Sequence, residues 1–173
     1  MKTFSHHITK SIQPRFGGFR QIAAAACVLA LLVATGTSAL AQASGQTRPY
    51  HAVAEHFVTP TAFGETFIGV GNATHQGKIV RYGINYYLGF NADGLFHGVG
   101  SSITVAANGD EDWATWTWTL DVSVPMEDWV VNVTWVTVGG TGRFKNATGE
   151  GTSVGRFNAA GNLVFTDDGV INY

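Results

Sequence analysis

Hydrophobic and polar residues alternate with a period of two over most of the chain from residue 51 onward. In the clearest run, residues 115–124, Trp116 and Trp118 fall on one face and threonines on the other. Such alternation is typical of antiparallel strands that bury one face. Asparagine- and glycine-rich turn sequences such as residues 91–94 separate the runs at hairpin spacing. We therefore predict strands over residues 52–59, 63–72, 77–89, 95–106, 112–124, 128–138, 150–157 and 162–171.

Eight short strands, with no convincing helical periodicity between them, favour an all-β domain built as an eight-stranded antiparallel barrel. Closing the sheet also removes the exposed edges that promote aggregation. We place this domain at residues 51–173. The polar stretch before it, residues 42–50, contains Ser44, Gly45 and Pro49 and is predicted to be a flexible linker.

The first 41 residues have the pattern of a secretory signal peptide. A basic leader without acidic residues precedes an apolar segment at residues 22–35 that is too short to span a bilayer comfortably. The small-x-small sequence of residues 39–41 follows, so we predict cleavage after Ala41. The alanine-rich leader is of a bacterial type. The mature protein is then expected to be periplasmic or secreted, with no membrane span. The alternative is that the leader stays uncleaved and serves as a membrane anchor.

Removal of this leader makes the protein acidic. The whole chain has 10 Lys and Arg and 12 Asp and Glu residues, and the leader holds four of the basic ones (Lys2, Lys10, Arg15 and Arg20). The mature net charge is therefore −6, which disfavours nucleic acid as a partner. The only cysteine, Cys27, also lies in the leader, so thiolate catalysis and cysteine-ligated zinc are excluded in the mature protein.

A glycine-rich segment at residues 139–149 resembles a segment of the allene oxide cyclase and dirigent barrel proteins. It is read Gly-Gly-Thr-Gly-Arg-Phe-Lys-Asn-Ala-Thr-Gly, and residues 71–78 are similar to a turn of exported bacterial members. The resemblance implies a calycin-like barrel in which Phe144 plugs the interior and Ala147 permits close packing. It does not carry an activity, because the cysteine of the allene oxide cyclase pocket has no counterpart in the mature chain.

Glu55 and Glu65 are the candidate catalytic residues. Each alternates with aromatic or aliphatic residues and is therefore expected on the apolar face of its strand. A carboxylate held inside a barrel would be desolvated and would have a raised pKa. The resemblance also implies a carboxylate from an early strand, which makes Glu55 the first to test. The alternative is that both side chains reach water near a barrel mouth.

Aromatic side chains on the predicted strands are the candidate ligand contacts. In a small barrel the same rings can instead fill the interior completely. The candidates are Tyr82, Tyr86, Trp116, Trp118 and Trp135.

Other polar residues suggest structural roles. No histidine pair has metal-ligand spacing, and His75 is expected to bond within its own turn. The acidic residues 110–112 favour a solvated hairpin tip over a calcium loop. We therefore predict neither a metal site nor a cofactor.

Three functional hypotheses remain. The first is an exported barrel that binds a small apolar ligand or acts as a non-catalytic module. The second is an isomerase or cyclase similar to allene oxide cyclase that needs no cofactor. The third is a dirigent-like or structural module that acts through a barrel mouth or a homo-oligomer interface.

Overall fold

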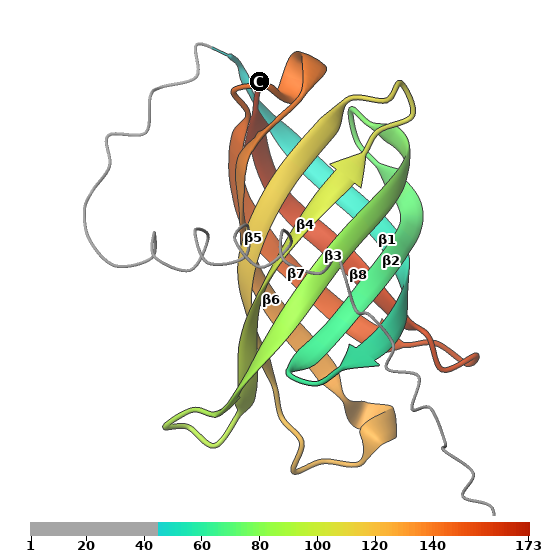
Figure 1. The fold of residues 1–173 in the computed structure, drawn as a ribbon, viewed down its shortest axis with the longest axis vertical. Helices are drawn as coiled ribbons and strands as arrows, with labels where there is room; N and C mark the ends of the chain where they lie inside the picture. Colours follow the sequence, from blue (N-terminus) through green and yellow to red (C-terminus); the bar gives the residue numbers. More distant parts are fainter. Residues whose placement is uncertain (1–44) are drawn as a thin grey trace, which may run out of the picture. The chain divides into compact units, whose positions relative to one another are not determined.

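A computed structural model describes residues 45–173, and the predicted signal peptide therefore lies outside the described residues. The described chain forms a closed antiparallel barrel in which each strand pairs with the next and the last pairs with the first (Figure 1). The predicted eight-stranded antiparallel barrel is confirmed. Its strands are β1 (Thr47–Thr61), β2 (Gly64–Ala73), β3 (Gly77–Phe90), β4 (Phe96–Val105), β5 (Glu111–Leu120), β6 (Val130–Gly140), β7 (Thr148–Phe157) and β8 (Leu163–Asn172).

Two strand boundaries differ from the prediction by more than two residues. β1 begins at Thr47, because residues 47–50 pair with β8 and the ring of Tyr50 is buried. These four residues belong to the barrel and not to a linker. β5 ends at Leu120, and Asp121 starts a turn by accepting a hydrogen bond from the amide of Ser123. No helix in residues 45–173 is long and apolar enough to cross a membrane.

The glycine-rich segment closes one end of the barrel. Gly139 has φ 139° and lies at a register shift between β5 and β6, and the short 3-10 helix η2 (Gly142–Phe144) follows. Phe144 is completely buried, as the resemblance implied, and its ring meets the ring of Tyr173 edge-on with centroids 4.9 Å apart. Buried Ala147 packs in the same cluster. Phe144 therefore plugs this end.

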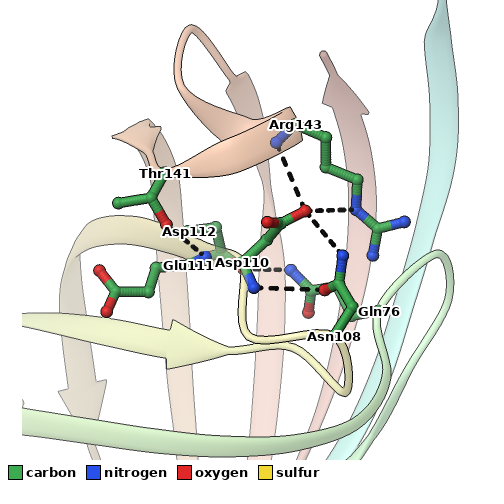
Figure 2. A network of polar contacts seen from close by, with 7 residues as sticks. All are labelled: Gln76, Asn108, Asp110, Glu111, Asp112, Thr141 and Arg143. Carbon is green, nitrogen blue, oxygen red and sulfur yellow. Dashed lines mark hydrogen bonds and ion pairs between the residues drawn. The ribbon is translucent and has the colours of Figure 1, made fainter.

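The loops at the plugged end are joined by polar contacts (Figure 2). Asp110, in the β4–β5 turn, accepts hydrogen bonds from Asn108 and from the backbone amide of Arg143. The guanidinium of Arg143 lies 3.6 Å from the same carboxylate. Thr141 accepts a hydrogen bond from the amide of Glu111. These contacts hold η2 against the β4–β5 turn.

Large interior rings pack directly against glycines of neighbouring strands. A Cβ added at Gly98 would lie 2.5 Å from Cζ2 of Trp118, and one at Gly83 would lie 2.5 Å from Cε1 of Phe67. A Cβ added at Gly155 would likewise lie 2.5 Å from Cε1 of Phe165. Because a glycine has no side chain, each ring can lie along the wall instead of projecting to the barrel axis. This arrangement keeps the centre of the barrel from being filled.

Candidate functional site

The barrel interior holds a cavity of about 280 Å³. Its lining extends from Tyr50 and Ile171, near the plugged end, to Val122 and Trp129 in the β5–β6 connection at the other end. The connection includes the 3-10 helix η1 (Met126–Asp128). Most of the lining is apolar and aromatic. The interior is thus a partly open pocket and not a completely packed core.

A buried ion pair stands on the cavity wall toward the plugged end. Arg81 of β3 donates from Nη2 to Oδ2 of Asp167 of β8 over 2.9 Å, and from Nε to the hydroxyl of Thr104 over 3.2 Å. The Asp167 residue is only 3% exposed. Burial alone would lower the pKa of Arg81, but the charge of Asp167 outweighs it and raises that pKa above its ordinary value. Arg81 is therefore a permanent cation with its counter-ion beside it.

Asp112 of β5 is a second buried carboxylate near this pair. It accepts a hydrogen bond from the side chain of Gln76, which comes from the β2–β3 turn (Figure 2). Burial raises the pKa of Asp112, although the charge of Arg81 and the hydrogen bond from Gln76 oppose the shift. The expectation that residues 110–112 form a solvated hairpin tip was therefore wrong for Asp112. Its side chain is buried, whereas the side chain of Asp110 is partly exposed in the loop.

His56 and Tyr50 of β1 complete the polar group in their neutral forms. Burial, aided by the positive charge of Arg81, lowers the pKa of His56 to about 3. The imidazole stacks on Phe67 with ring centroids 4.4 Å apart. Burial also raises the pKa of Tyr50 above its ordinary value, and its ring meets Trp135 edge-on at 5.4 Å. Neither side chain carries a charge near neutral pH.

Several residues that line the cavity have a buried polar atom that makes no hydrogen bond within the described chain. Buried polar groups are usually hydrogen-bonded, so such a concentration around one cavity marks places where a ligand or solvent atom can bond. The atoms are Oδ1 of Asp167, Nε2 of His56, Oγ of Ser102, and the indole Nε1 atoms of Trp118 and Trp135.

A separate hydrogen-bonded chain crosses the wall farther from the plug. The indole of Trp116 donates to Asn85 over 2.8 Å, and Asn85 donates to Glu65 over 3.0 Å. The hydroxyl of Tyr87 donates to the other oxygen of Glu65 over 2.7 Å. Burial, followed by this contact with Glu65, raises the pKa of Tyr87 above its ordinary value. Both carboxylate oxygens of Glu65 are thus engaged by neutral donors.

The predicted ligand contacts divide into two groups. Trp116, Trp118 and Trp135 line the cavity. Tyr82 and Tyr86 do not, because their side of β3 is the outer surface and they are 51% and 46% exposed. Their predicted interior position was therefore wrong. The alternation of β3 misleads because its outer face is the apolar one, while Arg81 and other polar or small residues face inward.

The two predicted catalytic carboxylates, Glu55 and Glu65, lie in different places. Glu65 lines the cavity. Glu55 lies outside it, and its carboxylate accepts hydrogen bonds from Asn158 and Asn162 of the β7–β8 turn over 2.7 and 2.8 Å. The apolar neighbours of Glu55, such as Val53, are on the outer surface. The expectation that Glu55 faces the barrel interior was therefore wrong.

The sequence analysis missed the pairing of Arg81 with Asp167. A signal was nevertheless present in the sequence, because Arg81 and Asp167 are charged residues inside predicted strands. The two residues are 86 positions apart in the sequence, so no local motif could indicate the pair.

Comparison with known proteins gives no family: no protein-family model matches the chain, and no curated protein matches it significantly. The function must be inferred from the site. Within residues 45–173, no group of three or more His, Cys, Asp or Glu side chains is placed to hold a metal ion. The site as described offers an aromatic enclosure, one paired cation and several free hydrogen-bonding atoms.

Proposed function

We propose that this protein is an exported bacterial barrel that binds a small, largely apolar molecule in its interior. The observation that carries the proposal is the cavity of about 280 Å³ lined mainly by aromatic and aliphatic side chains. A dry cavity of about 150 Å³ holds one benzene molecule, so this one suits a ligand of roughly ten non-hydrogen atoms. Export rests on the signal-peptide pattern of residues 1–41.

The walls support binding over simple packing of the core. The rings of Trp118 and Phe67 lie against glycines on neighbouring strands, which leaves space at the centre. Buried polar atoms around that space have no partner in residues 45–173, and small-molecule sites characteristically combine an apolar lining with a few polar groups. Binding of a ligand that is not chemically changed explains these features, and it requires no catalytic group.

Native mass spectrometry of the protein isolated from its own cell envelope or medium tests this function. We expect a non-protein mass to accompany the protein and to dissociate on unfolding. Ala114→Phe places a ring in the cavity wall and should abolish that mass. Thr115→Phe, one residue along and outside the cavity lining, is the matched control. A ligand-free native protein that also binds no small aromatic compound would refute the proposal.

A second candidate function, an interaction module that assembles with copies of itself, is supported by one surface feature. A row of exposed apolar side chains crosses five successive strands at paired positions. A row on the opposite part of the barrel is polar instead and runs Thr117, Thr134, Thr152 and Asp168. The apolar row consists of Phe57, Ile68, Tyr82, Ile103 and Trp113.

Contiguous exposed apolar surface of this kind is characteristic of protein interfaces. We propose that a second copy of the chain covers it. Light scattering should then give the mass of a dimer or larger oligomer, and Tyr82→Glu should shift the mass toward the monomer. Thr134→Glu, which adds the same charge to the polar row, should leave the mass unchanged. A monomeric native protein at high concentration would exclude this second candidate.

A further inference from the structure

The polar atoms of the cavity narrow the chemistry of the ligand that the proposed function requires. Oδ2 of Asp167 is bonded to Arg81, but Oδ1 of the same carboxylate is buried and has no partner within the described chain. Asp167 is one of the residues that line the cavity. An ionised carboxylate oxygen accepts hydrogen bonds and cannot donate them. The group that meets it must therefore be a donor.

The charges around the cavity argue against an anionic ligand. Arg81 is the only Lys or Arg side chain among the lining residues, whereas Glu65, Asp112 and Asp167 are acidic. The guanidinium of Arg81 already bonds Asp167 and Thr104. A ligand carboxylate would bring a further negative charge into this buried setting, where an uncompensated charge is costly.

A cationic head group is disfavoured as well. An ammonium ion at Oδ1 of Asp167 would lie close to Arg81, because both groups contact the same carboxylate. Desolvating the ammonium ion would add to that repulsion. A neutral hydroxyl group avoids both costs and supplies the donor.

We infer that the ligand is a neutral aromatic or alicyclic alcohol whose hydroxyl group donates a hydrogen bond to Oδ1 of Asp167. This inference rests on the proposed binding function. The hydroxyl group points toward the polar residues near the plugged end, and the ring system lies among Trp118 and the other aromatic side chains of the wall. The plug formed by Phe144 and the cavity volume together limit the ring system to about two fused six-membered rings.

Calorimetric titration with naphthalene, naphthol and naphthoate tests the inference on the native protein. These probes share one ring system and differ in the head group. A hydrogen bond to a charged acceptor is expected to make naphthol bind about tenfold or more tightly than naphthalene. Naphthoate should bind more weakly than naphthalene because of its charge.

Each other outcome is decisive. Equal affinities for naphthol and naphthalene, or tightest binding of naphthoate, would overturn the hydroxyl assignment while leaving the apolar pocket intact. Binding of none of the three would overturn the assignment and the proposed binding function together.

A pair of variants tests whether the preference for naphthol over naphthalene depends on Asp167. Asp167→Asn removes the charged acceptor, and we expect it to reduce the advantage of naphthol over naphthalene to less than about threefold. Asp168→Asn removes the same charge from the adjacent side chain, which is 67% exposed, and should preserve the full advantage. An undiminished advantage in a folded Asp167→Asn protein would contradict the assignment. If that variant does not fold, the three probes on the native protein still decide.

Discussion

At the scale of single residues, His56 shows how burial decides protonation in this barrel. Its imidazole lies between Phe67 and Phe165, with ring centroids 4.4 and 4.7 Å away. Protonation would place a charge in this apolar setting and close to the positive charge of Arg81, while the opposite charge of Asp167 compensates only in part. The native state therefore favours neutral His56, whereas an unfolded chain takes up a proton near the ordinary histidine pKa.

This difference predicts that His56 makes the protein less stable in acid. The pKa of His56 is lowered from 6.5 to about 3 by folding, so between these values the unfolded state binds more protons than the native state. The free energy of unfolding should then fall as pH falls, by about 1.4 kcal/mol per pH unit at most. His56→Phe keeps a stacking ring but cannot titrate. The fall in the free energy of unfolding that His56 causes at low pH should therefore be absent in this variant.

Chemical denaturation at about pH 7 and about pH 4.5 measures the effect as a difference between the two proteins. Asp112 acts with the opposite sign, because a carboxyl group whose pKa is raised by folding stabilises the protein as pH falls. Both proteins contain Asp112, so its contribution cancels. Identical losses of stability in the native protein and in His56→Phe would show that His56 is not buried in its neutral form.

At the scale of the strands, the pairing of glycines with rings leads to a prediction at Gly98. A methyl group there would lie 2.5 Å from Cζ2 of Trp118, and even closer to the carbonyl oxygen of Tyr86. Gly98→Ala should push the indole toward the cavity, lower the free energy of unfolding by about 1–3 kcal/mol and weaken binding of naphthalene.

Thermal unfolding and calorimetric titration give the two readouts for Gly98→Ala. Val99→Ile is the control, because it adds one carbon to the same strand at an exposed outer position and should change neither quantity appreciably. Unaltered naphthalene affinity in a folded Gly98→Ala protein would mean that Trp118 does not border the space that the ligand occupies.

The strands also show which features the sequence could predict. Strand positions and closure followed from alternation and turn residues, because these are local signals that repeat along the chain. The inward face could not be chosen reliably by hydrophobicity. On β3 the outward residues are apolar, as at Tyr82, while the inward residues include Arg81 and Asn85, which make their hydrogen bonds to other strands. The polar site depends on those long-range partners, so it could not be read from any one strand.

At the scale of the whole molecule, the pairing of β1 with β8 turns an open sheet into a cylinder. That pairing begins at Thr47 opposite Asn172 and includes Tyr50 opposite Gly169. The buried ring of Tyr50 packs against Trp135, and both residues line the cavity. The first four residues of β1 therefore contribute to closure of the barrel and to the site.

A chain that begins at Gly45 and one that begins at His51 should consequently differ sharply in stability. The shorter chain lacks four paired positions between β1 and β8 and the Tyr50 ring. Loss of a buried aromatic side chain alone costs about 3–5 kcal/mol, and the unpaired end of β8 becomes an exposed edge that favours aggregation. We expect a much lower melting temperature and aggregates on size-exclusion chromatography for the shorter chain only. Equal melting temperatures would show instead that residues 47–50 behave as the linker that their composition suggests, with the barrel closed by the remainder of β1.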